Sequence, residues 1–155
     1  MAKAFLVVRI KGQADVPHWA NTTLNLLNLE KKYRAVIIPV KDNTVGMLRK
    51  VQHYLSWQEI DIETTKELLD KKGRKSGYKK ITDEDVSKVG FKTFDELAKS
   101  LSEWKISMAK IKPIKPWFAL SPPRQGFKRS TKLLYGQKGV LGHNKELTTL
   151  IRRMM

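Results

Sequence analysis

The sequence predicts an α/β (α+β) fold, in which a βαβαβ body forms a two-layer sandwich and carries a helical insertion and a basic C-terminal extension. Three features lead to this prediction: short apolar runs rich in β-branched residues, amphipathic stretches between them, and basic side chains concentrated toward the C-terminus. Strands and helices that alternate in this order bury their apolar faces by packing the helices on one side of a sheet. We therefore expect three parts, at residues 1–62, 63–112 and 113–155.

Three segments of the first part have the composition of strands. Residues 5–10 are apolar and largely β-branched, and Gly12 follows them, which is typical of a buried strand. Residues 35–40 form a second such run. Pro39 lacks an amide donor, so it predicts a sheet edge or a strand end there. We assign the third strand to residues 57–62.

Two helices are expected between these strands. Asp15 and Pro17 are typical of a helix start and predict a helix that continues through Leu29. Asp42 can cap a second helix. The apolar residues that recur at helical spacing in this second segment are Val45, Leu48, Val51 and Leu55.

The middle part predicts several small helices. In a capping box a hydroxyl accepts from an amide three residues on, and the carboxylate at that position reaches back. Three pairs have this spacing: Thr64 with Glu67, Thr93 with Glu96 and, as a weaker version, Thr82 with Asp85. The apolar stripe that follows the second pair consists of Phe94, Leu97, Ala98, Leu101 and Trp104.

The charge of the chain is strongly positive and unevenly distributed. Its 155 residues include 31 lysines and arginines against 15 acids, which gives a net charge of +16. Residues 105–155 carry 12 basic side chains and one acidic side chain, so about two-thirds of the excess charge lies in the last third. A protein this basic repels itself unless a polyanion neutralises it, and nucleic acid is therefore the expected partner.

The composition excludes several other classes of protein. The longest apolar runs are about six residues, far below the roughly 20 that a transmembrane helix needs, so we expect no membrane partner. The N-terminal residues carry a charge every few positions, unlike a signal peptide. The absence of cysteine rules out disulfides and thiolate metal sites and permits a reducing cytoplasm.

No catalytic constellation is present in the sequence. His18, His53 and His143 are scattered and form no metal-binding pair. No nucleophile elbow and no phosphate-binding Walker loop occurs. Asp83 and Asp85 stand at an expected helix start, where capping and the helix dipole explain them. We therefore expect no enzyme, no cofactor, no metal and no small-molecule substrate.

Two basic segments are the candidate RNA-binding regions. Residues 71–80 hold six basic side chains, two glycines and Tyr78, a composition in which cations bind phosphate, glycine allows close approach and tyrosine stacks on an unpaired base. Residues 121–132 combine two prolines, Phe127 and four basic side chains, and the stiff prolines reduce the entropy lost on docking. The alternative for each segment is a solvated surface. The candidates in the two segments are Lys72, Arg74, Lys75, Tyr78, Lys79, Lys80, Arg124, Phe127, Lys128, Arg129 and Lys132, and Lys138 is a further candidate beyond them.

The remaining aromatic residues favour burial over stacking on bases. Trp19, Trp57 and Trp104 are expected in the core. Residues 117–120 are apolar within the basic extension, so we expect them to anchor it on the body, and they are also an alternative partner for the sheet. Residues 154–155 are expected to be a frayed end.

Several fragments, in the same order and spacing, resemble the L-thirty family of large-subunit ribosomal proteins, whose eukaryotic counterparts are called L-seven. In the body they are Phe5 to Ile10, Thr23-Leu24 with Leu27, and Val45-Gly46-Met47-Leu48 followed by Val51, Tyr54 and Trp57. In the extension they are Pro116 to Lys128, Leu141-Gly142 and Leu150 to Met154, which look like the closing block of the long archaeal and eukaryotic form. The resemblance spans essentially the whole chain.

The resemblance implies a ferredoxin-like body that binds large-subunit rRNA in the cytoplasmic ribosome, near the attachment of the five-S rRNA and beside other ribosomal proteins. It implies no chemical step and no cofactor. The family's basic closing block carries RNA contacts over to Arg124, Lys128, Arg152 and Arg153. The chain departs from the family pattern at Gln58, Lys138 and Asn144. Glycine is usual at the first of these positions, a glycine pair is usual around the second, and arginine is usual at the third.

Two hypotheses from other classes compete with the ribosomal one. An RNA-processing enzyme on the same scaffold would need a base and an electrophilic stabiliser in a cleft, and the sequence offers no such set. A DNA-packaging protein would share the charge, but it would bind duplex DNA as well as structured RNA.

Overall fold

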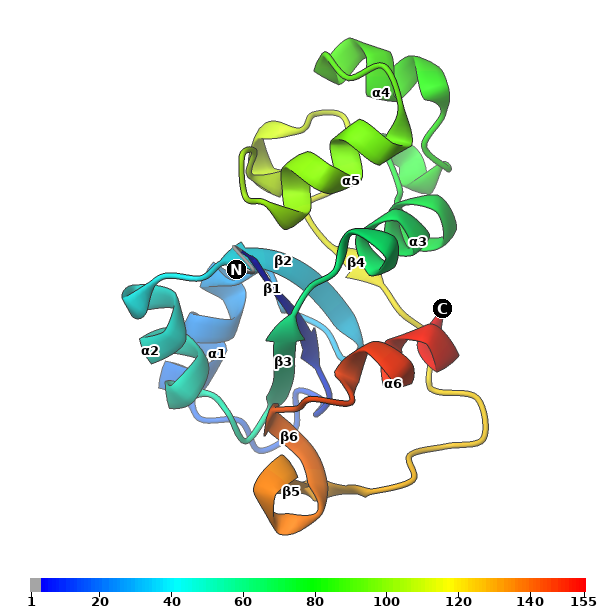
Figure 1. The fold of residues 1–155 in the computed structure, drawn as a ribbon. Helices are drawn as coiled ribbons and strands as arrows, with labels where there is room; N and C mark the ends of the chain where they lie inside the picture. The colour runs from blue at the N-terminus through cyan, green and yellow to red at the C-terminus, as the bar shows by residue number, and fades with distance from the viewer. Residues whose placement is uncertain (1–3) are drawn as a thin grey trace.

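The computed structural model describes residues 4–155, which form a six-stranded sheet with helices on both faces (Figure 1). The strand order is β4-β2-β1-β3-β6-β5. The elements of the body are β1 (Ala4–Arg9), α1 (His18–Leu26), β2 (Arg34–Pro39), α2 (Asp42–Lys50) and β3 (Leu55–Glu59). β1 pairs antiparallel with both β2 and β3. This arrangement confirms the α/β class and the predicted βαβαβ order.

The elements after the body extend the sheet and cover its second face. They are α3 (Ile62–Lys72), α4 (Asp83–Val89), α5 (Phe94–Ser102), β4 (Phe118–Ala119), β5 (Ser130–Leu134), β6 (Gly139–His143) and α6 (Leu147–Met154), with short 3₁₀ turns at Ser76–Tyr78, Met108–Lys110 and Tyr135–Gln137. In Figure 1, α1 and α2 lie on one side of the sheet, and α6 lies on the other. The two-layer body predicted from the sequence is therefore present, and the later segments add a third layer to it.

Residues of β1 alternate between two cores. Phe5 and Val7 pack with buried residues of α1 and α2, whereas Leu6 and Val8 pack with residues of α3, α5 and α6. Successive side chains of a strand point to opposite faces, so a strand covered on both sides needs a continuous apolar run. This double coverage explains why residues 5–10 contain almost no polar side chain. The core that contains Leu6 and Val8 includes residues from all three predicted parts of the chain.

Three boundaries differ from the sequence prediction. α1 ends at Leu26, since Asn28 takes a left-handed conformation (φ 60°) that a helix cannot continue through. The third strand runs from Leu55 to Glu59 instead of 57–62, because its antiparallel register pairs Leu55 with Arg9 and Glu59 with Phe5. Leu55 is therefore a strand residue and not part of the helical stripe.

The helix caps were predicted with mixed success. The prediction that Thr64 caps a helix was wrong, because α3 starts earlier, at Ile62, and Thr64 is buried inside it. Thr93 caps α5 as predicted and accepts a hydrogen bond from the amide of Glu96 at 3.3 Å. The pair rated weakest, Thr82 with Asp85, forms a complete capping box at α4.

The aromatic residues and the C-terminus also give mixed results. Trp57 is in the core as predicted, whereas Trp19 is 48% exposed, which contradicts the prediction. Phe118 is fully buried, and β4 pairs with β2 at the sheet edge, which confirms that residues 117–120 anchor the extension. The predicted frayed end was wrong, because Met154 is fully buried as the last residue of α6.

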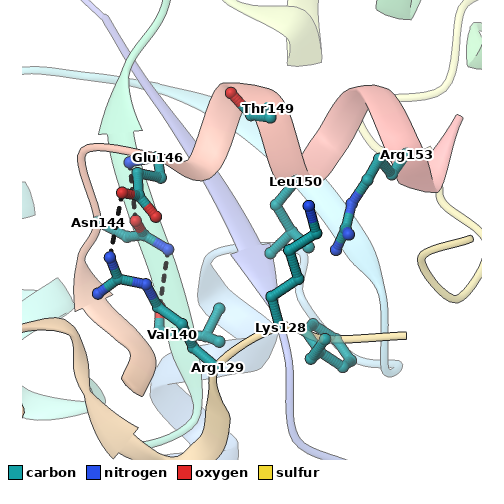
Figure 2. Close-up of a pocket in the computed structure, with 9 residues that line it drawn as sticks. Lys128, Arg129, Val140, Asn144, Glu146, Thr149, Leu150 and Arg153 are labelled. Carbon is teal, nitrogen blue, oxygen red and sulfur yellow. Dashed lines mark hydrogen bonds and ion pairs between the residues drawn. The ribbon is translucent and has the colours of Figure 1, made fainter. Parts of the chain in front are cut away.

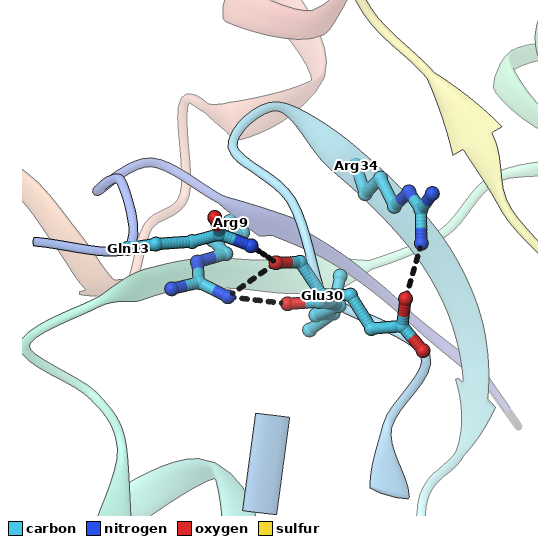
Figure 3. Close-up of polar contacts among 5 residues, drawn as sticks. Arg9, Gln13, Glu30 and Arg34 are labelled. Atoms are coloured by element: carbon cyan, nitrogen blue, oxygen red, sulfur yellow. Dashed lines mark hydrogen bonds and ion pairs between the residues drawn. The ribbon is translucent and has the colours of Figure 1, made fainter. Parts of the chain in front are cut away.

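Arg9 is fully buried and is held by backbone carbonyls (Figure 3). Its guanidinium donates hydrogen bonds to the carbonyl oxygens of Lys11, Gly12, Leu29 and Glu30 at 2.7–3.1 Å. Burial lowers the pKa of Arg9 from its usual value. A buried cation needs such partners because an unsolvated charge is costly. Arg9 thus ties the end of β1 to the connection that leads into β2.

Candidate nucleic-acid interface

The connection between β4 and β5 is held against the C-terminal end of α6. The amide of Ser121 donates to the carbonyl of Met154, and the amide of Arg124 donates to the carbonyl of Arg153, both at 3.0 Å. The Arg153 guanidinium donates to the carbonyl of Gly126 at 2.8 Å. Carbonyls at a helix end lack partners within the helix, so they are natural acceptors for a passing chain. The basic extension is therefore part of the folded surface.

Three cations from two predicted segments meet beside this connection, and we call them the three-cation cluster: Lys72, Arg74 and Arg124. The Lys72 ammonium donates to the hydroxyl of Ser121 at 3.2 Å. Burial, followed by the positive charges of Arg74 and Arg124, lowers the pKa of Lys72. None of the ion pairs found among residues 4–155 involves these three side chains. The cluster is thus a set of like charges without an internal counter-ion.

A second group, the aromatic–cation cluster, adjoins the first through Arg74. Its members are Arg34, Arg74, Tyr78, Lys115 and Trp117. The Arg34 guanidinium lies 3.9 Å from the centre of the Trp117 ring, and the Lys115 ammonium lies 5.0 Å from both the Tyr78 and the Trp117 rings. The two ring centroids are 6.4 Å apart. Such a surface offers charge for phosphate and aromatic faces for unpaired bases.

A pocket of about 370 Å³ lies between α6, the end of β6 and residues 127–129 (Figure 2). Its lining residues are Phe127, Lys128, Arg129, Val140, Asn144, Glu146, Thr149, Leu150 and Arg153. The Phe127 ring is stacked on Tyr33 with centroids 6.3 Å apart. Arg129 pairs with Glu146 at 3.1 Å, whereas the Lys128 ammonium is exposed and makes no ion pair with the described residues. The pocket therefore combines an apolar floor with a mainly basic rim.

Two predicted RNA contacts also have partners within the protein. The Lys75 ammonium lies 2.8 Å from the buried carboxylate of Asp85. Its hydrogen bond, together with those from Thr82, holds the pKa of Asp85 well below its usual range. Arg152 lies 3.6 Å from Glu67 and 4.0 Å from Glu63, so it links α6 to α3. Their role at an RNA surface stays a prediction.

The other predicted residues lie on exposed surface. Lys79 and Lys80 flank the turn that carries Tyr78, and Lys132 lies on β5. Lys138 stands in the turn between β5 and β6 with a left-handed backbone (φ 64°). Lys80 forms an isolated antiparallel β-bridge with Arg74 of the clusters above, and the carbonyl of Lys79 accepts from the amide of Lys75 at 2.9 Å. Their roles also stay predictions.

Three residues of the aromatic–cation cluster were not predicted from the sequence. Arg34 lies on β2, while Lys115 and Trp117 come from the start of the extension. Trp117 was expected only to anchor the extension, and the two cations lie outside the basic runs. The signal that could have found Lys115 and Trp117 is the segment 110–117, where Ile111 and Ile114 are each followed directly by a lysine and a proline precedes Trp117. No local pattern indicates Arg34.

Two polar side chains, those of Gln58 and Asn144, hold α6 in place. The side-chain oxygen of Gln58 accepts from the amide and hydroxyl of Thr148, at 3.0 and 3.1 Å. Asn144 is buried, donates to the carbonyl of Val140 and accepts from the amide of Glu146 at 2.8 Å. Amides in the first turn of a helix need such acceptors. These two side chains therefore act at the start of the helix that forms one wall of the pocket.

Neither a metal-binding group of side chains nor a membrane-spanning helix is found in the described part of the chain. Within residues 4–155, no three histidine or acidic side chains gather closely enough to hold a metal ion. None of the helices described is long and apolar enough to cross a bilayer.

Comparison with known proteins identifies the family. The profile of the family "Ribosomal protein L30p/L7e" matches residues 5–55. The chain is 64% identical over 155 residues to "Large ribosomal subunit protein uL30" of Nitrosopumilus maritimus (strain SCM1), and 63% identical to the protein of that name from Cenarchaeum symbiosum (strain A), with all chains covered in full. It is 44% identical over 162 residues to the protein of Staphylothermus marinus, again over the full length of both chains. The chain therefore belongs to the uL30 (L30p/L7e) family of large-subunit ribosomal proteins, in its long archaeal form.

Proposed function

We propose that this chain binds large-subunit rRNA through its cationic surface and helps to anchor the region where the five-S rRNA attaches. The cationic surface comprises the three-cation cluster, the aromatic–cation cluster and the rim of the pocket. As a member of the uL30 family, the chain is a structural constituent of the large ribosomal subunit in the cytoplasm, and not an enzyme. What we propose is which residues contact the rRNA and which RNA region they hold.

The observation that carries the proposal is the lack of internal counter-ions in the three-cation cluster. Lys72 lies close enough to Arg74 and Arg124 for their charges to lower its pKa, and none of the three has an acidic partner within residues 4–155. Like charges held together destabilise a free protein, and a phosphate backbone relieves this repulsion. The three-cation cluster of the folded chain is thus suited to bind a polyanion.

The aromatic–cation cluster supports RNA over duplex DNA. Tyr78 is 52% exposed and stands beside Trp117, with cations around both rings. Exposed rings bind the unstacked bases of RNA loops and bulges, which duplex DNA does not offer. We assign the phosphate contacts to the predicted cations and base stacking to Tyr78.

The division of the surface into two sites supports the proposed anchoring of the five-S rRNA region. The aromatic–cation cluster and the pocket are joined by the rigid connection over α6, so two RNA segments can be held by one folded body. In reconstituted large subunits, omission of the chain is expected to lower the content of five-S rRNA. Full retention of five-S rRNA in such particles would contradict this part of the proposal.

The rRNA-binding proposal is tested by titration of the pure chain with large-subunit rRNA at several salt concentrations. With about 6–10 phosphate contacts, affinity should fall on the order of 10³–10⁵-fold between 50 and 200 mM salt. Duplex DNA of equal length serves as the control and should bind more weakly. An affinity that stays constant over this range would rule out the mechanism.

Variants locate the contacts. Arg124→Ala and Lys128→Ala should each weaken rRNA binding and lower the slope of log affinity against log salt by about 1. Because both side chains are exposed and without an ion pair, the free energy of unfolding should hardly change. Lys99→Ala on the exposed face of α5 is the matched control. Binding by both variants at the level of the parent would refute these assignments.

A further inference from the structure

We infer that the pocket beneath α6 receives a single unstacked nucleotide of the rRNA, with its base on the apolar floor and its phosphate at Lys128 and Arg153. This inference deepens the proposed function and rests on it. It names one site and one kind of ligand within the cationic surface, whereas the proposed function requires only that phosphates are bound somewhere along it.

The floor of the pocket suits the flat face of a base. Phe127, Val140 and Leu150 supply apolar surface from three different elements. Tyr33 stacks on the Phe127 ring at 29° between the planes, which holds the ring in one orientation. A rigid aromatic ring and branched side chains bind a base without preference for its hydrogen-bonding edge. A volume of about 370 Å³ is in the range of pockets that hold small organic ligands.

Two cations of the rim, Lys128 and Arg153, have no acidic partner among the described residues, whereas Arg129 pairs with Glu146. In Figure 2 the Lys128 ammonium and the Arg153 guanidinium both extend into the space below α6. One guanidinium nitrogen of Arg153, Nη1, is buried without a hydrogen-bond partner among the described residues, whereas Nη2 donates to Gly126. A buried donor of a charged group without an acceptor is costly, and a phosphate oxygen would satisfy it. Because Nη1 is closed to solvent, the Arg153 side chain must turn toward the pocket for a phosphate beside Lys128 to satisfy this donor.

The opposite wall can contact the edge of the base. Glu146 binds Arg129 through one carboxylate oxygen, Oε1, and the side chain stays 56% exposed. Asn144 is held by its bonds to Val140 and Glu146. A carboxylate accepts hydrogen bonds from amino groups of bases. We therefore expect guanine, whose ring N–H and amino group lie side by side, to be preferred over uracil, which offers a single ring N–H donor.

A protein side chain is a less suitable occupant than a nucleotide. An acidic side chain from a neighbouring protein would pair with the rim cations, but it would leave the apolar floor uncovered. An aromatic side chain would cover the floor but would leave Arg153 Nη1 without an acceptor. Among common ligands of a ribosomal protein, a nucleotide carries both a flat apolar face and an anion.

The test uses the full chain with methyl-labelled leucine and valine and follows the NMR signals of Val140 and Leu150. Four probes are titrated: guanosine 5′-monophosphate, uridine 5′-monophosphate, guanosine and inorganic phosphate. We expect the guanine nucleotide to shift both signals and to shift them more than the uracil nucleotide does. Equal shifts with inorganic phosphate alone would reveal a simple anion site and overturn the inference, as would the absence of shifts with any nucleotide.

Two variants connect the pocket to rRNA binding. Thr149→Trp places a bulky ring at an exposed position of the pocket wall, and Lys128→Gln removes one rim charge. Each should weaken rRNA binding by about 10-fold, the effect of losing one stacked base or one close phosphate contact. Leu133→Trp, at an exposed position outside the pocket lining, is the control for a surface tryptophan.

The pocket site and the proposed function can be contradicted separately. If Thr149→Trp binds rRNA as the parent does, while Lys72→Gln and Arg124→Gln weaken binding, the pocket inference is overturned and the proposed function stands. If the parent itself fails to bind rRNA, the proposed function is overturned together with the inference. If another ribosomal protein protects the pocket and rRNA does not, the pocket inference is overturned in favour of a protein occupant.

Discussion

Arg9 and Arg124 show two different uses of arginine in one chain. Arg9 is fully buried at the end of β1, and its guanidinium donates to four backbone carbonyls. Arg124 is exposed beside Lys72, and its side chain makes no hydrogen bond or ion pair with any residue from 4 to 155. Neither has an acidic partner. An arginine whose donors are satisfied inside the fold stabilises the fold, whereas one left unsatisfied at the surface is available to an external anion.

The largest effect is expected for Arg9→Met. Methionine retains most of the apolar volume, but four carbonyls lose their donor, so the free energy of unfolding should fall by about 3 kcal/mol. Urea denaturation measures this change. Arg49→Met, at an exposed position of α2 without an ion pair among the described residues, is the matched control and should stay close to the parent. Folded Arg9→Met should still bind rRNA. A variant as stable as the parent would mean that the four carbonyls are well solvated without Arg9.

The reverse pattern is expected for the double variant Lys72→Gln with Arg124→Gln. Loss of two cations should weaken rRNA binding by about 100-fold at moderate salt and lower the salt slope by about 2. Stability should rise slightly, because Lys72 no longer faces like charges. Filter binding and urea denaturation measure the two quantities on one preparation. A drop in stability without loss of rRNA binding would contradict the distinction between Arg9, which stabilises the fold, and Arg124, which binds RNA.

Much of the fold could be predicted because single elements carry strong local signals. β1 was placed within one residue, since an uninterrupted apolar run has few alternatives. Thr93 and the stripe at Leu97 and Leu101 identified α5 and its buried face. The third strand was misplaced by two residues at its start and three at its end, because only pairing with β1 determines the register. Local patterns thus identify elements better than they locate their ends.

The interface could be predicted only as segments of charge. Composition locates cations along the chain, but the partners of a side chain are a tertiary property. Lys75 pairs with Asp85 and Arg152 with Glu67, while Lys72 pairs with no acid among residues 4–155, although all three belong to basic runs. The pocket was not predictable either, because α6, β6 and residues 127–129 meet only in the folded chain.

A smaller effect is expected at Lys75 and Asp85, which test a cation with an internal partner. Because the pKa of Asp85 is lowered on folding, its contribution to stability is present above about pH 4, the range of an unfolded aspartate, and is lost as the pH falls through the lower pKa of the folded state. Asp85→Asn should therefore lose stability at neutral pH and show a weaker decline on acidification. Denaturation curves between neutral pH and pH 2 measure this. Asp83→Asn, exposed at the same helix start, is the control. Identical acid profiles of Asp85→Asn and the parent would contradict the role of this carboxylate.

The smallest effect is expected at Lys138, where the backbone and the charge make opposite demands. Its left-handed conformation favours glycine, so Lys138→Gly should raise the free energy of unfolding by about 0.5–1 kcal/mol. The neighbouring Gly139 cannot be replaced by a residue with a side chain, since an added Cβ would lie 1.8 Å from the carbonyl oxygen of Leu133. If Lys138 also touches RNA, Lys138→Gly will lower the salt slope of rRNA binding by about 1 while it stabilises the fold. Lys138→Asn, which tolerates the same backbone and lacks the charge, should lower the slope equally. If the salt slope of rRNA binding is unchanged in both variants, Lys138 makes no RNA contact.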